Sequence, residues 1–182
     1  MVVAGRLDPL KGFDLAIEAV AALPADRRPT LVVAGEESVD YRDYPAELQA
    51  LATSRGIGGG VRFVGPQSRA DLAELLGSAS VVAVPSHSET YGLVALEAAA
   101  SGTPVVAAAA GGLREAVVDG VTGIVLRSRD PLVWADAIGR ILQDPALAAS
   151  LSTTARVRAT GLSWAHSADA LVAVYRSQLA VH

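Results

Sequence analysis

Two basic residues near the N-terminus are the first groups in this sequence that suit the binding of an anion. Arg6 and Lys11 follow Gly5 in the stretch GRLDPLKG, and Lys11 is the only lysine of the chain. A guanidinium offers a planar fork of donors and an ammonium offers a compact positive charge, so together they suit a diphosphate. The ordinary alternative for an isolated Arg and Lys is a pair of solvated surface cations.

Two glutamates further along the chain are spaced to reach different parts of one long ligand. Glu89 and Glu97 are separated by seven residues in the stretch PSHSETYGLVALEA. A helix is expected to begin near Gly92 or Leu93, which places Glu97 about 7 Å further along its axis. A carboxylate that accepts from vicinal hydroxyls suits a sugar ring or a ribose. Taken alone, Glu97 is more often an exposed helix residue, but its apolar neighbours favour a carboxylate that needs a partner.

The start of this helix is a third candidate for anion binding. The first N–H groups of a helix have no partner within it, and the helix dipole also favours phosphate at that end. Gly92 lets the backbone approach a ligand closely because it has no Cβ. A second glycine pair, Gly111–Gly112, precedes another predicted helix and either adds amides to the same site or forms a plain turn.

These groups need elements to position them, and the chain alternates between two patterns. Short apolar, β-branched runs bounded by Gly or Pro predict buried strands at 2–4, 30–34, 61–64, 81–84, 105–107 and 123–126. Between these runs, apolar residues at helical spacing predict helices, and Ser68 three residues before Asp71 resembles a capping box. Helices alone follow the sixth strand, at 131–143, 145–159 and 163–180.

Strands that alternate with helices predict a doubly wound, Rossmann-like α/β fold. Its parallel sheet of about six strands has the order 3-2-1-4-5-6, with helices on both faces and extra C-terminal helices. In that order the first and fourth strands are neighbours, and ligands bind beyond their carboxyl ends. The loop with Arg6 and Lys11 and the loop with Glu89 follow these two strands, so we expect them to meet.

Composition limits the class of protein. A chain of 182 residues suits a single domain, and its net charge of -4 gives no general attraction to nucleic acid. Cysteine is absent, and neither the carboxylates nor His166 and His182 show a metal-ligand pattern, so no metal or other cofactor is expected. No apolar run has the roughly 18 residues of a membrane span, and the start lacks a signal peptide. We therefore expect a cytoplasmic protein without indicated membrane association.

With these residues assembled, the chain resembles the retaining family 4 glycosyltransferases of the two-Rossmann-domain (GT-B) fold. The stretch from Pro85 to Ala98, with its two glutamates separated by seven residues (the EX7E motif), resembles their signature. GRL at 5–7, KG at 11–12, GTPVV at 102–106 and GVTG at 120–123 match as well. Within that family the chain is most similar to actinobacterial mycothiol-pathway D-inositol-3-phosphate glycosyltransferases.

The resemblance implies a role for each matching residue in holding a nucleotide-sugar donor, with UDP favoured as the nucleotide. Arg6 and Lys11 would hold the diphosphate, Glu97 the ribose hydroxyls and Glu89 the hydroxyls of the donor sugar. The remaining donor-binding positions are Gly5, Gln67 near the base, and the backbone amides of Tyr91, Gly92, Leu93 and Val94. Gln67 stands where an Arg is expected, so the sequence leaves the base identity open.

The resemblance also implies a mechanism. Family members retain the anomeric configuration by front-face attack, in which the leaving phosphate helps to take the proton of the acceptor. Glu89, Arg6 and Lys11 are the expected catalytic residues, with Glu89 as a positioning and electrostatic group rather than a glycosidase-type nucleophile.

Residues 1–182 are expected to form one nucleotide-sugar-binding domain, the C-terminal half of such a hexosyltransferase. An N-terminal acceptor-binding domain of the same enzyme would be its partner, and this half alone would be inactive. Two alternatives stay open: half of a sugar-nucleotide epimerase or hydrolase, and a non-catalytic nucleotide-binding module. A nicotinamide-binding oxidoreductase is disfavoured because GRLDPLKG lacks the G-x-G-x-x-G fingerprint.

Overall fold

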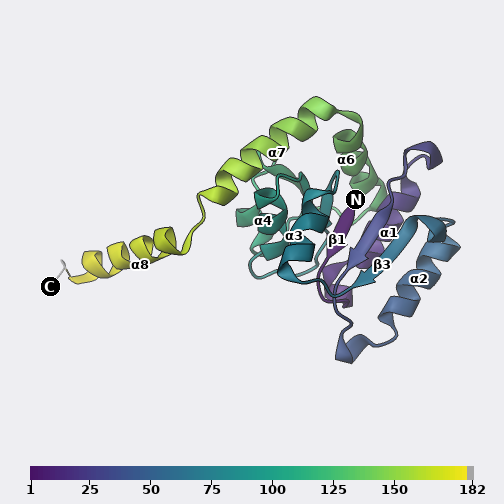
Figure 1. The fold of residues 1–182 in the computed structure, drawn as a ribbon, viewed down its shortest axis with the longest axis horizontal. Coiled ribbons are helices and arrows are strands. Elements are labelled where there is room, and N and C mark those ends of the chain that lie inside the picture. Colours follow the sequence, from purple (N-terminus) through teal and green to yellow (C-terminus); the bar gives the residue numbers. More distant parts are fainter. Residues whose placement is uncertain (180–182) are drawn as a thin grey trace.

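The computed structural model describes residues 1–179 and is built around one parallel β-sheet (Figure 1). Its six strands run in the order β3-β2-β1-β4-β5-β6, which confirms the predicted fold class and strand order. The strands are β1 (Val2–Ala4), β2 (Leu31–Ala34), β3 (Val61–Gly65), β4 (Val82–Val84), β5 (Val105–Ala108) and β6 (Gly123–Leu126). Every predicted strand is therefore present, with ends that differ from the prediction by at most one residue.

Helices cover both faces of the sheet. The α-helices are α1 (Phe13–Ala22), α2 (Tyr44–Ser54), α3 (Arg69–Gly77), α4 (Leu93–Ala100), α5 (Leu113–Ala116), α6 (Pro131–Gln143), α7 (Pro145–Thr160) and α8 (Trp164–Leu179). Helix α1 packs against α2 and α6, whereas α4 packs against α3, α5 and α7. Because the crossovers of parallel strands are right-handed, reversing direction at β1 and β4 puts these two groups on opposite faces.

The core forms where the strands are apolar on both sides. The residues of β1, β4 and β5 are all buried, as expected for central strands covered on two faces. Trp134 of α6 is fully buried, and its indole Nε1–H donates to the carbonyl of Ser128 at 2.8 Å. The predicted cap of α3 is also confirmed, since the hydroxyl of Ser68 accepts from the N–H of Asp71.

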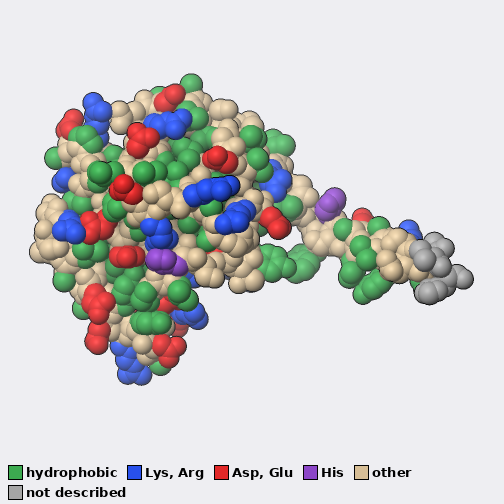
Figure 2. Space-filling model, turned by 180° about the vertical axis from the view of Figure 1, so that it is seen from behind, with side chains coloured by type: hydrophobic (Ala, Val, Ile, Leu, Met, Phe, Trp, Pro, Cys, Tyr) green, Lys and Arg blue, Asp and Glu red, His purple; other side chains and the backbone are tan. Residues whose placement is uncertain are grey.

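Helix α8 stands clear of the rest of the molecule (Figures 1 and 2). None of its residues is buried, and Trp164 at its start is 92% exposed. The sequence predicts a helix over 163–180, of which Ala180 lies outside the described residues, as does His182. None of the described helices is both long enough and apolar enough to cross a membrane.

A close backbone approach joins two loops at the carboxyl edge of the sheet. The Lys11 loop (residues 5–12) follows β1, and the Glu89 loop (residues 85–92) follows β4. Gly12 has a left-handed φ of 72°, and a Cβ at this position would lie 2.2 Å from the carbonyl oxygen of Pro85. Only glycine fits here, because any other residue would suffer both backbone strain and this overlap.

Gly12→Ala is therefore expected to destabilise the fold more than Gly56→Ala. Gly56 has nearly the same φ, 71°, but a Cβ there would meet nothing within 4 Å, so it is a matched control for the backbone strain alone. We expect the free energy of unfolding to fall by about 1–3 kcal/mol more for Gly12→Ala than for Gly56→Ala. Urea denaturation of both variants measures the difference, and equal losses would contradict the close approach.

Candidate functional site

The Lys11 loop and the Glu89 loop meet at the carboxyl edge of the sheet, as the strand order predicts. β1 and β4 pair directly in parallel register, so both loops leave the sheet side by side. The N–H of His87 donates to the carbonyl of Leu10 at 2.7 Å, which joins the loops through their backbones. The residues proposed from the sequence for the diphosphate and for the sugar thus lie in one region of the molecule.

An ion pair links the two loops at the centre of this region. The Lys11 Nζ donates to Glu89 Oε2 at 2.8 Å, and the side chains are only 28% and 16% exposed. From the sequence we expect these two residues to bind neighbouring parts of a ligand. In the structure they are instead in direct contact with each other. Their separation by 78 positions in the chain explains why this contact has no signal in the sequence.

The carboxylate of Glu89 lies in a strongly electropositive environment. Partial burial raises its pKa, but the hydrogen bond and charge of Lys11 lower it, together with the backbone N–H groups of Gly92 and Tyr91. The lowering effects outweigh burial, so the pKa of Glu89 lies below the ordinary value of 4.5. The carboxylate accepts from Lys11 and, at 3.1 Å, from the N–H of Thr90 in the loop that leads into α4.

Arg6 and Lys11 do not converge on one point, although the sequence predicts that they bind the same diphosphate. The Arg6 Nε donates to Asp8 Oδ2 at 3.1 Å, and the Arg6 side chain is 66% exposed. Asp8, which the sequence analysis did not single out, is buried and also accepts from the N–H of Leu10. An Asp directly before a Pro is a common cap signal, so this second role was available from the sequence.

Gly92 serves the structure in a way that the sequence analysis did not consider. It has a left-handed φ of 79° and precedes the first residue of α4, as predicted. A Cβ there would lie 2.9 Å from Leu113 Cδ2 and 3.1 Å from the Cβ of Ala116. Helix α5 thus packs onto this glycine, which supplies a reason for it besides the approach of a ligand.

Of the two readings left open for Gly111–Gly112, the structure favours the turn. The N–H of Gly112 donates to the carbonyl of Glu89 at 2.9 Å, so this amide is not free for an anion. A Cβ on Gly111 would lie 2.0 Å from the same carbonyl oxygen. The backbone of the glycine pair therefore packs closely against the backbone of the Glu89 loop.

A hollow of about 230 Å³ opens beside these loops, over the ends of β1, β2 and β3. Its lining includes three residues predicted from the sequence, namely Gly5, Gln67 and Val94, together with Glu36, which was not predicted. The side-chain Nε2 of Gln67 donates to the carbonyl of Val64 at 2.9 Å, and it also lies within bonding distance of the next two carbonyls. These bonds fix the amide and leave its oxygen as an acceptor.

Glu97 lies next to this hollow rather than in it. It lines a smaller neighbouring hollow of about 170 Å³, and Leu72 lines both. Partial burial raises the pKa of Glu97, and the charge of nearby Arg69 acts in the opposite direction. Much of the Glu97 surface nevertheless remains in contact with solvent, and Glu97 makes no ion pair within the described part of the chain, so the partner expected from its apolar neighbours is not present.

Arg69 supplies a cation where the sequence analysis found none. It begins α3, two residues after Gln67, and lines the same small hollow as Glu97. The position of Gln67 lacks the Arg that the resemblance leads one to expect, and Arg69, two positions further along the chain, lies beside Glu97 rather than in the hollow that Gln67 lines.

Tyr91 and Leu93, the other two residues predicted to bind the donor, lie at the surface. Tyr91 and Leu93 are 71% and 61% exposed, so their side chains are not fixed by packing against the rest of the domain. Tyr91 also lines a hollow of about 410 Å³ on the other side of α4, away from Gly5 and Gln67. The structure thus gathers Gly5, Gln67 and Val94 in one hollow and joins Lys11 to Glu89, whereas Arg6, Tyr91 and Leu93 face outward.

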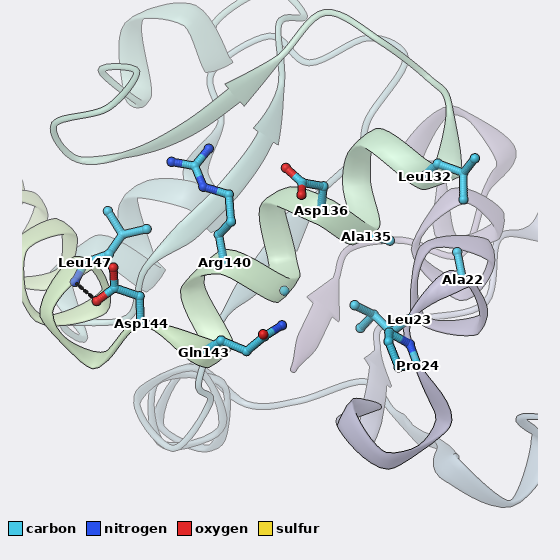
Figure 3. A pocket seen from close by; sticks show the side chains of 11 residues that line it. Ala22, Leu23, Pro24, Leu132, Ala135, Asp136, Arg140, Gln143, Asp144 and Leu147 are labelled. Carbon is cyan, nitrogen blue, oxygen red and sulfur yellow. Dashed lines mark hydrogen bonds between the residues drawn. The ribbon is translucent and has the colours of Figure 1, made fainter.

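A more spacious hollow of about 590 Å³ lies elsewhere and contains none of the predicted residues (Figure 3). It is bounded by the end of α1, by α6 and by the start of α7, and Asp136 and Arg140 of α6 are among the residues that line it. Because α1 begins at the carboxyl edge of the sheet, its end lies at the opposite edge. Size therefore does not identify the candidate site, and within residues 1–179 no group of three or more metal-ligating side chains does so either.

Comparison with known proteins matches these observations to one family. The sequence model of the family described as "Glycosyl transferases group 1" matches residues 1–158. The D-inositol 3-phosphate glycosyltransferase of Mycobacterium avium (strain 104) is 50% identical over 173 residues, covering 94% of this chain and 40% of the relative. The protein of the same name from Salinispora arenicola is 46% identical over 184 residues, covering 98% and 41%. The chain thus spans about two fifths of the length of these curated relatives.

Solved structures agree with this match. The crystal structure of Anabaena Alr3699/HepE in complex with UDP superposes with a TM-score of 0.85 at 31% sequence identity. The match covers 97% of this chain and 48% of the HepE chain. The domain described here therefore has a counterpart of the same fold, the GT-B glycosyltransferase fold, within a longer protein.

The ion pair predicts how the pKa of Glu89, and with it the pH dependence of stability, changes when Lys11 is replaced. In Lys11→Met the burial of Glu89 and its neighbouring backbone N–H groups remain while its cation is removed, so its pKa is expected to rise above the value in the unmutated chain. In the unmutated chain the lowered pKa of Glu89 contributes stability above pH 4.5 that is lost as the pH falls through the folded-state value, and the variant lacks the part of this contribution that comes from Lys11. Side-chain NMR titration measures both pKa values, with Glu97 as an internal control; an unchanged Glu89 pKa would contradict the pairing.

Proposed function

We propose a function from one established premise: this chain belongs to the family of group 1 glycosyl transferases. The proposed function is to bind a nucleoside diphosphate sugar at the carboxyl edge of the sheet and to present it for glycosyl transfer, as part of a hexosyltransferase. The observation that carries the proposal is the anion site around the Glu89 carboxylate, which accepts from Lys11 Nζ at 2.8 Å and from the N–H of Thr90 at 3.1 Å, directly before the residues that lead into α4.

In the ligand-free chain the Glu89 carboxylate occupies the anion site that we propose for the diphosphate. A phosphate oxygen accepts from the same donors as a carboxylate oxygen, namely an ammonium and backbone N–H groups at a helix start. In the donor complex, Lys11 would turn from Glu89 to the diphosphate, and Arg6, which is exposed, would add its remaining donors. Glu89 would then be free to accept from hydroxyls of the donor sugar.

The nucleoside would occupy the adjoining hollow. The backbone of Gly5 and the amide of Gln67 line its walls, and Val94 supplies an apolar contact for a flat ring. Glu97, one turn further along α4, would accept from the ribose hydroxyls. We infer UDP as the nucleotide because HepE, with a TM-score of 0.85 to this chain, was crystallised with UDP, and because the fixed Gln67 leaves an acceptor oxygen that suits the imide N–H of uracil.

Charge placement supports transfer by a departing diphosphate rather than through an enzyme nucleophile. The lowered pKa of Glu89 keeps it ionised, but its ion pair with Lys11 marks it as a positioning and electrostatic group. As the bond between sugar and phosphate breaks, negative charge grows on the diphosphate, where Lys11, Arg6 and the first amides of α4 would stabilise it. Retention of anomeric configuration is proposed on the resemblance described above.

The open rim of the site leads us to infer a partner that covers it. Leu10, Tyr91 and Leu93 expose apolar side chains around the Lys11–Glu89 pair. We propose that an acceptor-binding domain, N-terminal to this one in the intact protein, closes over this rim, and that residues 1–182 alone hold a donor without transferring its sugar. A D-inositol phosphate acceptor is proposed from the names of the relatives. An epimerase or hydrolase would need no acceptor, so product analysis of the intact protein separates these classes.

Calorimetric titration with UDP, GDP and ADP tests the proposed site. Lys11→Met is expected to weaken UDP binding about 10- to 100-fold, because a charge-assisted bond to the diphosphate is lost. Glu97→Gln is expected to weaken it less, through the ribose. Arg140→Met removes a cation at the opposite edge of the sheet and is the matched control, with no expected change. Equal effects of Lys11→Met and Arg140→Met would show that the site is misassigned.

Glu89→Gln separates the roles of nucleotide and sugar. Removing this carboxylate frees Lys11, so binding of UDP is expected to be unchanged or tighter. The extra affinity that the sugar gives to UDP-N-acetylglucosamine over UDP is expected to shrink, because a charged acceptor for its hydroxyls is lost. The ratio of the two dissociation constants, measured by calorimetry in the unmutated chain and in the variant, reports the effect. An unchanged ratio would argue against a sugar contact by Glu89.

A further inference from the structure

Arg129 lies in the connection between β6 and α6, and its side chain reaches both loops of the candidate site. Its Nη1 donates at 2.8 Å to the carbonyl of Pro85, the first residue after β4. Its Nη2 would lie 3.0 Å from a Cβ on Gly12, so the guanidinium packs against that glycine. Because Pro85 begins the Glu89 loop and Gly12 ends the Lys11 loop, one side chain spans both.

The surroundings of Arg129 show that a carboxylate does not hold it in place. Within the described residues no ion pair involves it, although its side chain is partly buried. Burial lowers its pKa, and the negative charge of Asp14 acts in the opposite direction. A charged donor to a backbone carbonyl makes a bond that is stronger than a neutral one and fixes the position of that carbonyl.

Three links join the Lys11 loop to the Glu89 loop, and they differ in what happens when a ligand enters. They are the Lys11–Glu89 ion pair, the bond from the His87 N–H to the Leu10 carbonyl, and the Arg129 contact. In the proposed donor complex Lys11 turns to the diphosphate and Glu89 to the sugar, so the ion pair no longer joins the loops. The backbone bond and Arg129 are then left to hold their spacing.

We propose that Arg129 is a positioning residue, which holds the Lys11 loop and the Glu89 loop at the spacing that lets Lys11 and the first amides of α4 act on one diphosphate. This inference rests on the proposed function. It assigns to Arg129 no direct contact with the ligand, because its observed bond goes to a carbonyl of the protein.

Amide hydrogen exchange of the ligand-free chain tests the spacing by itself. In Arg129→Met, exchange of the His87 N–H, which bridges the two loops, is expected to be about tenfold faster. Arg129→Lys keeps a charged donor for the Pro85 carbonyl and is expected to recover part of the protection. Arg127→Met, an exposed residue of the same connection, is the matched control and should leave exchange unchanged. Unchanged exchange at His87 in Arg129→Met would overturn the proposal.

A double-mutant cycle with UDP tests whether Arg129 acts through Lys11. Arg129→Met is expected to weaken UDP binding roughly 5- to 10-fold in the unmutated chain and less than about twofold in Lys11→Met, because the group that it positions is then missing. Losses that simply add would indicate a general structural role and would overturn the proposal. If the unmutated chain does not bind UDP, the proposed function fails, and the exchange of His87 alone decides whether Arg129 sets the spacing of the loops.

Discussion

The parallel pairing of β1 with β4 is the constraint on which the rest of the site depends. Val2 and Val3 lie in register with Val82 and Ala83, and the chain turns away from these two strands in opposite directions. The loops that follow them must therefore share the space above the sheet. They come so close that the backbone of Gly12 leaves no room for a Cβ against Pro85. The overlap that a Cβ at position 12 would make with this carbonyl is why only glycine allows the two loops to come so close.

Electrostatics then decides what happens in the space that remains. A partly buried ammonium without a partner is costly, and Glu89 removes that cost for Lys11. The same carboxylate also accepts from the N–H of Thr90 at 3.1 Å, so one side chain satisfies donors from both loops. Lys11 and Glu89 are thus already paired in the ligand-free chain, and an anion bound as proposed would exchange one set of hydrogen bonds for another of similar kind.

Periodicity and punctuation in the sequence were sufficient to predict the architecture. Apolar runs without alternation marked strands covered on both faces, and their order in the sheet placed the two functional loops together. Contacts between side chains far apart in the chain were beyond this reasoning. The bond from Arg129 to Pro85 spans 44 positions, and the ion pair of Lys11 with Glu89 spans 78. Glu97 shows a further limit, because apolar neighbours in sequence did not imply a partner in space.

Helix α8 gives the chain a second, separate equilibrium. Its 16 residues contribute no buried side chain to the core, so its stability comes from its own backbone hydrogen bonds. Isolated helices of about this length are marginal in water. The helix–coil transition of α8 is thus uncoupled from the cooperative unfolding of the sheet and the helices that cover it. A single free energy of unfolding describes that packed body, whereas the circular dichroism of the whole chain sums two transitions with different midpoints.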